Sequence, residues 1–370
     1  MRSVLQLRTS EDRGLAPGAD TGLTIEASLR FRDPQIEMAH GAGGKASRRL
    51  VDGLFAPLLF DSGQPALGDR LSDAARVTVG GAPVAITTDS FVVTPLVFPG
   101  GSIGELAVNG TVNDLAVGGA RPVALVTTFV LEAGLPTDTL AAEVRAMGRA
   151  AREAGVAIVG GDTKVVEHGK VDRLYITTTG IGQPLAGVSL SARLVCPGDQ
   201  IILSGPIGDH GITILLARGE LDLEADLGSD TRSVFPMVEA LVTAAGPSVR
   251  WMRDPTRGGV ATSLNELALD SGLGVHLFEE SIPVRDEVRG ACELLGLDPL
   301  HIANEGQFLA VVTAEQASRA LDAIRAAGGA GAVIIGEVRD EPAGAVLVAT
   351  RYGGTRIVDM LVGDPLPRIC

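Results

Sequence analysis

Short apolar runs separated by glycine, proline and polar residues dominate the chain from about residue 37 onward. Four runs in the first half have strand length, and the run at 124–131 combines Val, Thr and Phe and is long enough for a central strand. Residues 136–155 have helical periodicity, with start signals at Pro136, Thr137 and Asp138 and a stop at Gly155. The predicted strands cover 84–88, 124–131, 156–159 and 174–180.

The second half repeats this alternation. A loop opens a helix at 208–217, and further helices are expected at 260–269 and 314–327. Pro184 and Gly187 interrupt the apolar pattern within 182–193, which favours a domain boundary there. The predicted strands cover 200–204, 307–313, 332–338 and 345–349. We therefore expect an α/β (α+β) fold with a flexible extension at 1–35, an N-terminal domain at 36–185, a C-terminal domain at 186–350 and a tail at 351–370.

The charge balance excludes two classes of partner. The chain of 370 residues has a net charge of −14, and such a protein repels nucleic-acid phosphates and anionic membranes. No apolar run reaches the ~18 residues of a membrane span, and the first residues lack the apolar core of a signal peptide. Three cysteines without metal-ligand spacing indicate free thiols rather than a disulfide scaffold. We expect a cytoplasmic protein with no nucleic-acid or membrane partner.

The segment His40-Gly-Ala-Gly-Gly-Lys45 is a candidate phosphate loop. Gly41, Gly43 and Gly44 would let the backbone approach a phosphate closely, and Lys45 could neutralise it. The spacing differs from that of a P-loop, which has four residues between its first glycine and Gly-Lys-Ser/Thr. A flexible loop explains the segment equally well.

Three aspartates stand at the edges of predicted elements. They are Asp89 in Thr87-Thr-Asp-Ser90, Asp114 after Asn113, and Asp254 at the start of Asp-Pro-Thr-Arg-Gly-Gly. The carboxyl ends of strands are where α/β proteins build sites, and Mg²⁺ prefers carboxylates together with substrate phosphates. Any one of them alone is more typical of a turn or a helix N-cap. Their number favours a metal site.

Two further segments add candidate catalytic groups. Gly160-Gly-Asp-Thr-Lys164 stands at another predicted strand end and brings Lys164, and Ala303-Asn-Glu-Gly306 brings Glu305. A single lysine or glutamate after a strand is usually solvated surface. The residues alone therefore leave the roles of Lys164 and Glu305 open.

Cys370 is the last residue of the segment Asp364-Pro-Leu-Pro-Arg-Ile-Cys. Two prolines prevent a helix there, which predicts a tail that can carry an exposed thiol away from the body. The α-carboxylate raises the pKa of the neighbouring thiol, so a nucleophilic thiolate is not the obvious purpose. A carrier role requires reach more than acidity, whereas the alternative is an incidental terminal thiol.

Together these segments resemble the AIR synthase-related (PurM-like, ATP-binding) superfamily, which includes selenophosphate synthetase and thiamine-monophosphate kinase. The terminal Pro-Arg-Ile-Cys resembles the HypE family of hydrogenase maturation factors within it, and the resemblance extends over about 36–370. The matching segments are 40–45, 87–90, 113–122, 160–164, 254–259 and 303–306.

The resemblance implies a homodimer whose N-terminal domains pair into a β-barrel, with C-terminal α/β domains alongside. It also implies a reaction on the tail. A HypF-like carbamoyltransferase places a carbamoyl group on the terminal cysteine, and ATP-dependent dehydration converts it into a thiocyanate. The cyanide then passes to iron on a HypC–HypD complex and becomes a ligand of the [NiFe] hydrogenase centre.

The resemblance assigns roles to individual residues. Cys370 would carry the reacting group, Glu305 would accept a proton from its nitrogen, and Lys164 would stabilise charge or relay a proton. Mg²⁺ would be held by Asp89, Asp114 and Asp254. Nucleotide and phosphate contacts would come from Gly41, Gly43, Gly44, Lys45, Asn113, Gly160, Gly161, Asp162, Thr163 and Arg257.

Three alternatives lead to different functions. Selenophosphate synthetase normally carries a cysteine or selenocysteine beside its glycine-rich loop, and residues 36–45 contain neither. An aminoimidazole ribonucleotide synthetase would not need a tail thiol. A non-catalytic scaffold that delivers a thiol-bound group would not need the set of aspartates with Lys164 and Glu305.

Overall fold

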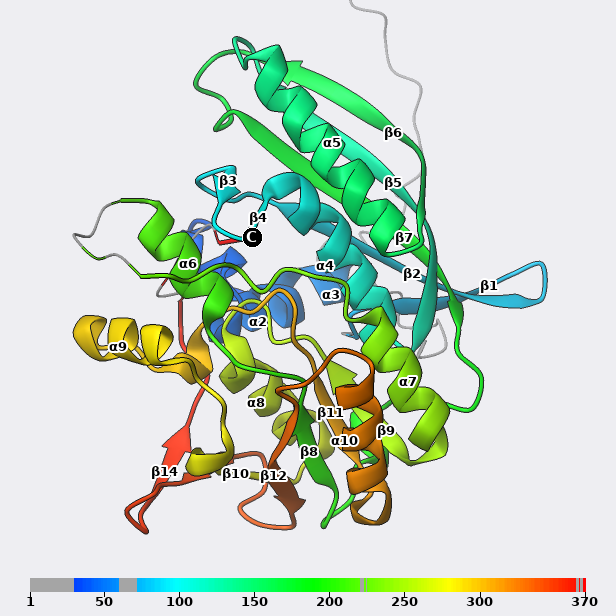
Figure 1. Cartoon of the computed structure of the whole chain (residues 1–370), viewed down its shortest axis with the longest axis vertical. Coiled ribbons are helices and arrows are strands. Elements are labelled where there is room, and N and C mark those ends of the chain that lie inside the picture. The colour runs from blue at the N-terminus through cyan, green and yellow to red at the C-terminus, as the bar shows by residue number, and fades with distance from the viewer. Residues whose placement is uncertain (1–29, 60–71, 220–222, 224, 364–365, 367–368) are drawn as a thin grey trace, which may run out of the picture.

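Two mixed β-sheets organise the chain, one above the other in Figure 1. The computed structural model describes residues 30–59, 72–219, 223, 225–363, 366 and 369–370. The expected flexible extension at 1–35 therefore lies mostly outside the described residues. None of the helices in these ranges is long and apolar enough to span a membrane.

The N-terminal sheet has five strands. Its neighbours are antiparallel except β5 and β6, which run parallel and are joined by the crossover helix α5 (Thr137–Glu153). The helices α4 (Ile103–Val117) and α5 cover one face of this sheet, while its other face is open (Figure 1). The strand order is β1 (Ala75–Val79), β2 (Ala82–Phe91), β7 (Leu174–Pro184), β5 (Ala120–Glu132) and β6 (Ala157–Val166).

The C-terminal sheet has seven strands, of which only β10 and β13 are parallel neighbours. The strand order is β14 (Thr355–Val358), β13 (Val346–Ala349), β10 (Gly274–Phe278), β12 (Val333–Arg339), β8 (Gln200–Leu203), β11 (Leu309–Val312) and β9 (Val249–Arg253). The helices of this half are α6 (Asp209–Ala217), α7 (Phe235–Ala245), α8 (Gly259–Ser271), α9 (Asp286–Leu295) and α10 (Ala317–Ala326).

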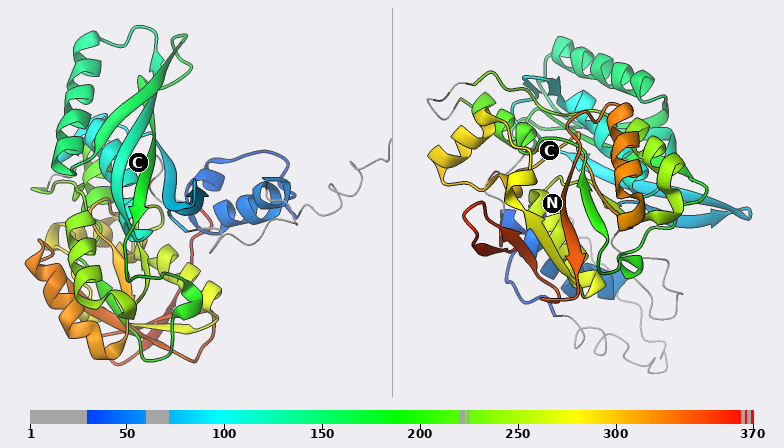
Figure 2. Two further views of the ribbon diagram at one scale, coloured as in Figure 1. Left: turned by 90° about the vertical axis from the view of Figure 1, so that its right-hand side faces the viewer. Right: turned by 60° about the horizontal axis from the view of Figure 1, so that its bottom comes forward.

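Two small units flank the sheets. A short hairpin of β3 (Val97–Phe98) and β4 (Gly101–Ser102) precedes α4. The glycine-rich segment opens α2 (Gly44–Leu50), which continues through a π-helical turn (Val51–Phe55) into α3 (Ala56–Leu59). Figure 2 shows α2 and α3 to one side of both sheets.

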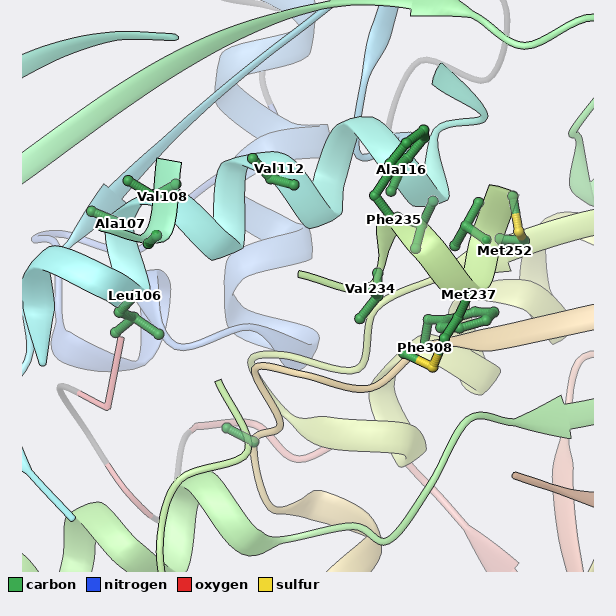
Figure 3. Close-up of a cluster of buried hydrophobic side chains, with 14 of the residues drawn as sticks. Leu106, Ala107, Val108, Val112, Ala116, Val234, Phe235, Met237, Met252 and Phe308 are labelled. Atoms are coloured by element: carbon green, nitrogen blue, oxygen red, sulfur yellow. The ribbon is translucent and has the colours of Figure 1, made fainter. Parts of the chain in front are cut away.

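One hydrophobic core joins the two halves of the chain (Figure 3). Leu106, Val112 and Ala116 of α4 lie in the same buried cluster as Phe235 of α7 and Phe308, which precedes β11. Thirteen of the fifteen α4 residues are buried, so this helix has no exposed face. Burying a large apolar side chain contributes roughly 1.5–3 kcal/mol, and α4 therefore fixes the two halves against each other.

Each strand expected from the sequence is present, as is the helix at 136–155, but one expectation was wrong. Residues 160–164 do not follow a strand end, because β6 continues through them beside β5 as far as Val166. Gly161 allows this pairing, since a Cβ at this position would lie 1.8 Å from the carbonyl oxygen of Thr127. The structure thus gives Gly161 a packing role in the sheet.

We predict that Gly161→Ala destabilises the protein while Gly160→Ala does not. The added methyl group at 161 must displace the β5 backbone, at a cost of about 1–3 kcal/mol, whereas nothing lies within 4 Å of a Cβ at 160. Midpoints of urea denaturation measure the difference. Equal losses in the two variants would contradict the close approach as the reason for glycine at 161.

Candidate functional site

A cavity of about 410 Å³ brings together segments that are far apart in the sequence. It is bounded by the glycine-rich loop before α2, the end of β2, α4, the loop between β9 and α8, and the loop before β11. Eight predicted site residues line it: Gly41, Gly43, Asp89, Asp114, Asp254, Arg257, Glu305 and Cys370.

Carboxylates form the floor of this cavity. Oxygen atoms of Asp73, Asp114 and Asp254 all lie within 4.8 Å of one another. Asp114 is in the last turn of α4 and accepts the Thr87 hydroxyl at 2.8 Å, and Asp254 directly follows β9. Asp89 lines the same cavity from β2. Asp114 and Asp254 were predicted metal ligands, whereas Asp73 was missed because a single aspartate before a strand carries no distinctive signal.

Burial and the neighbouring negative charges together determine the pKa values of these carboxyl groups. Burial, followed by the charges of Asp254, Asp73 and Asp89, raises the pKa of Asp114 well above its ordinary value. Burial and the charge of Asp73 do the same for the pKa of Asp254, against the opposing effect of Arg253. The pKa of Asp73 rises to about 6, mainly through burial, although Arg253 lies 3.0 Å away. Such a set of oxygens suits a hard divalent cation, which would offset this repulsion.

Glu305 is held on the wall of the cavity by its backbone. Its N–H donates to Asp230 Oδ1 at 3.0 Å, and its carbonyl accepts the Asn113 side chain at 3.0 Å. The side chain is 3% exposed, and Oε1 has no hydrogen-bond partner among the described residues. Burial, with the charges of Asp254, Asp89 and Asp230, raises the pKa of Glu305 well above its ordinary value. The side chain is therefore a buried carboxyl group suited to proton transfer.

Asn113 braces the site and does not face it. Its Nδ2 donates to the carbonyl oxygens of Arg232 and Glu305, and its Oδ1 accepts the N–H of Val234 at 2.8 Å. With 1% of its surface exposed and its amide occupied by three backbone groups, Asn113 has little capacity left for a phosphate. Its predicted phosphate contact is replaced here by a structural role.

Asn304, next to Glu305, joins two further loops. Its Oδ1 accepts the N–H of Gly208 at 2.7 Å, and its Nδ2 donates to the carbonyl of Pro255 at 2.9 Å. The loop of Asp254 and the loop of Glu305 are thus held together by a buried amide. Unpaired buried amides are costly, which explains an asparagine at this position.

Arg257 is a second cation of the cavity, in addition to Arg253. Its Nη1 donates to the Gly41 carbonyl at 2.9 Å, and its Nη2 lies 3.7 Å from Asp89 Oδ1. Attraction to Cys370, followed by that of Asp89 and Glu305 against the effect of burial, raises the pKa of Arg257. Arg257 therefore links the glycine-rich loop, the acidic floor and the end of the chain.

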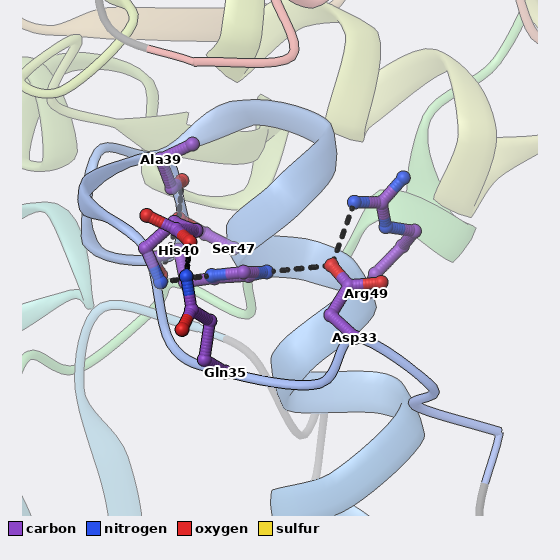
Figure 4. A network of polar contacts seen from close by, with 7 residues as sticks. Asp33, Gln35, Ala39, His40, Ser47 and Arg49 are labelled. Atoms are coloured by element: carbon purple, nitrogen blue, oxygen red, sulfur yellow. Dashed lines mark hydrogen bonds and ion pairs between the residues drawn. The ribbon is translucent and has the colours of Figure 1, made fainter.

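The glycine-rich loop is folded rather than loose. Gly43 and Gly44 have φ of +78° and +72°, and a Cβ on Gly44 would lie 2.4 Å from the Leu361 carbonyl oxygen. Before the loop, Nε2 of the buried His40 lies 2.8 Å from Asp33 Oδ2, and its Nδ1 accepts the Glu37 N–H at 2.8 Å (Figure 4). These contacts keep the Gly41 carbonyl turned toward Arg257.

The tail is packed against the body. Ile369 is 3% exposed, and its carbonyl oxygen lies 2.9 Å from Nε2 of His210. Figure 1 places the C-terminus inside the outline of the molecule, near the β3–β4 hairpin and α6. The expectation of an exposed terminal thiol was therefore wrong for this conformation, because the apolar Leu366 and Ile369 are buried in the core.

The two predicted lysines lie away from the cavity. Lys45 pairs with the carboxylate of Asp359, and Lys164 lies 2.9 Å from Asp162 with 67% of its side chain exposed. Side chains alternate along a strand, and the register places Lys164 beside Val130 on the open face of the N-terminal sheet. Along β2 the side chains of Thr88 and Ser90 are exposed on the open face of the sheet. Asp89 lies between them in the sequence, so its side chain is on the face that the helices cover.

The same register separates the rest of that segment from the acidic cluster. Gly160, Gly161, Asp162 and Thr163 are exposed along β6, the edge strand, and none of them lines the cavity. Within one chain the structure does not bring them near Asp114 or Glu305. Their roles in nucleotide binding stay predictions.

Comparisons with known proteins agree with this arrangement. Residues 71–183 match the family described as AIR synthase related protein, N-terminal domain, and residues 196–349 match its C-terminal domain. Carbamoyl dehydratase HypE of Azotobacter vinelandii is 51% identical over 343 residues, covering 92% of this chain and 99% of that protein.

Solved structures are similar over most of the chain. The structure titled HypE-HypF complex is 44% identical with a TM-score of 0.78, covering 84% of this chain and 99% of that chain. HypE in complex with ATP is 46% identical with a TM-score of 0.75, covering 91% and 100%. The chain thus belongs to the AIR synthase-related family and, within it, to the HypE carbamoyl dehydratases.

Proposed function

We propose that this protein uses ATP to dehydrate a carbamoyl group on its own Cys370 to a thiocyanate, which supplies cyanide for [NiFe] hydrogenase assembly. One observation carries the proposal: the terminal cysteine, a buried carboxyl group and a carboxylate cluster line one cavity. The reacting group is thereby tethered beside the groups that would act on it, which converts the reaction into an intramolecular one.

The chemistry assigns separate tasks to the groups in the cavity. The carbamoyl oxygen attacks the γ-phosphorus of ATP, and ADP leaves. The carbon–oxygen bond then breaks with release of phosphate, while the nitrogen loses one proton to a base in the cavity and the other to the departing phosphate and becomes the nitrile. Glu305 is placed to accept a proton from nitrogen, because its buried carboxyl group reaches the cavity and its Oε1 is not engaged among the described residues. Arg257 is placed to contact phosphate oxygens.

Mg²⁺ fits the carboxylate cluster. Asp73, Asp114 and Asp254 would hold it, with Asp89 nearby, since all four offer oxygen ligands of the kind that Mg²⁺ prefers. When bound, Mg²⁺ supplies positive charge for the triphosphate. Asp73 thus joins the three predicted ligands.

We predict that Asp73→Asn and Asp114→Asn abolish stabilisation by Mg²⁺ and a non-hydrolysable ATP analogue. Wild type should show a higher thermal midpoint with both ligands, because ligands that bind the folded state stabilise it. Asp322→Asn is the control, since Asp322 is exposed on α10 outside the cavity. An undiminished shift in Asp73→Asn would remove Asp73 from the proposed metal site.

We predict that Glu305→Gln retains the carbamoyl adduct and stops dehydration. Intact-mass analysis after incubation with a HypF-like carbamoyltransferase and ATP should show the adduct on Cys370, followed in wild type by loss of one water. Because the pKa of Glu305 is raised, the wild-type rate should increase with pH through a value well above the usual Glu pKa of ~4.3. Normal thiocyanate formation by Glu305→Gln would refute its role as base, and Glu293→Gln, an exposed change on α9, serves as the control.

The open face of the N-terminal sheet supports a homodimer. Ile86, Val126 and Ile181 are exposed, large and apolar, and the register places them side by side on this face. Among the described residues, α4 and α5 cover the opposite face, and a second copy of the chain would bury this apolar surface. Lys164 lies on the same open face and does not line the cavity of its own chain. It would therefore take part in the reaction only in the cavity of the partner subunit.

We predict that Val126→Asp converts the protein to monomers, because it places a charge in the proposed interface. Size-exclusion chromatography with light scattering measures the mass. Val144→Asp on α5 is the matched control, since Val144 and Val126 are 46% and 42% exposed. A dimer that survives Val126→Asp would contradict this interface.

Two protein partners complete the proposal. A HypF-like carbamoyltransferase would load Cys370, which is supported by the similar chain solved as a HypE-HypF complex. A HypC–HypD complex carrying iron would receive the cyanide, and the whole sequence would take place in the cytoplasm. The sequence places prolines at 365 and 367, which disfavour a helix before Cys370, as transfer of the thiol between three sites requires.

A further inference from the structure

The docked tail is held partly by apolar burial. Leu366 and Ile369 are 5% and 3% exposed and belong to the core cluster that joins the two halves of the chain. The hydrophobic effect has no direction, so these contacts alone do not set how far Cys370 extends into the acidic cavity. A directional contact is needed to place the sulfur.

His210 provides such a contact. It is the second residue of α6 and has no exposed surface, and its Nε2 lies 2.9 Å from the Ile369 carbonyl oxygen. This carbonyl belongs to the peptide bond that joins Ile369 to Cys370. The hydrogen bond therefore fixes the backbone one residue away from the thiol.

Contacts within the body orient the ring independently of the tail. Nδ1 of His210 lies 2.7 Å from the Ser229 hydroxyl oxygen, and the ring packs edge-on against Phe98 with centroids 5.7 Å apart. The loop that carries Ser229 is itself held by its N–H, which donates to the Pro99 carbonyl at 2.8 Å. The site that receives the tail is thus built from α6, the segment around Ser229 and the β3–β4 hairpin.

The geometry also defines the tautomer. A carbonyl oxygen only accepts, so Nε2 carries the hydrogen, and Nδ1 accepts the hydrogen of the Ser229 hydroxyl. Burial lowers the pKa of His210 to about 4, which keeps the ring neutral near pH 7. Each ring nitrogen then has one matched partner.

We infer that His210, oriented by Ser229, is a positioning residue that sets the register of the docked tail and so stops Cys370 at the acidic cavity. The inference rests on the proposed function in one respect: the position of the docked tail affects catalysis only if a group on Cys370 reacts in the cavity. His210 contacts the tail backbone and none of the reacting atoms.

Two substitutions of similar size separate the hydrogen bond from the packing. The amide of His210→Gln can still donate to the Ile369 carbonyl, whereas the thioether of His210→Met cannot. The readout is the rate at which iodoacetamide alkylates Cys370, measured by peptide mass spectrometry relative to the exposed Cys196 in the same molecule. This rate reports how often the tail leaves its docked position and requires no ATP or partner.

We predict that Cys370 reacts about tenfold faster in His210→Met, as expected for the loss of one buried hydrogen bond. In His210→Gln the rate should stay within about threefold of wild type, because the donor to the tail is kept. His276→Met is the control, since Nε2 of His276 also contacts a carbonyl, that of Glu341, from β10. A wild-type rate in folded His210→Met would overturn the inference.

Two further measurements keep the inference testable. If circular dichroism shows that His210→Met is unfolded, Ser229→Ala replaces it, and protection of Cys370 equal to wild type in that variant overturns the inference. With the carbamoylated chain and ATP, His210→Met should slow dehydration about tenfold at unchanged nucleotide affinity. A wild type without dehydration would defeat the proposed function and leave the alkylation result standing, whereas unchanged alkylation with normal dehydration would defeat this inference alone.

Discussion

The buried side chain of Asn113 ties the two halves of the chain together where the cavity forms. It accepts one backbone N–H and donates to two backbone carbonyls of the C-terminal half, including that of Glu305. Asp114, the next residue of α4, then faces the acidic cluster. Leaving one group of a buried amide unpaired costs about 1–3 kcal/mol. The hydrogen bonds of Asn113 and the position of Asp114 in the site therefore both depend on the placement of α4.

The electrostatic character of the cavity follows from this placement. Carboxylates from α4, from the end of β9 and from the segment before β1 converge on one point, and Arg253 and Arg257 only partly compensate their charge. Burial first, and the neighbouring carboxylates second, raise the pKa values of both Asp114 and Glu305. A divalent cation and a phosphate chain would share the cavity in the usual order, with the cation against the carboxylates and the phosphates against the cation.

The tail adds a tethered group to an otherwise rigid site. Its apolar side chains bury themselves in the core, and its penultimate carbonyl meets a histidine whose other nitrogen is already engaged. Non-covalent contacts of this kind can be broken and remade, as a thiol that visits other proteins requires.

The sequence by itself determined the α/β class, eight of the strands, the amphipathic helix α5 and the residues Asp114, Asp254 and Glu305 as parts of one site. These features depend on local periodicity, on turn chemistry or on segments that resemble a known family. It did not indicate α4, because a helix buried on all sides has no polar face and shows no helical period.

Only the tertiary structure decided the remainder. Asp73 became a candidate ligand because β9 and α4 lie beside it, and Asn113 became a brace because its partners come from the other half of the chain. The pairing of β6 with β5 places the side chain of Lys164 on the open face of the sheet. Side chains alternate between the two faces of a strand, so neighbours in a sequence motif can lie on opposite faces. The docking of Cys370 depended on His210, Ser229 and a core built from both halves, and such long-range contacts leave no local pattern in the sequence.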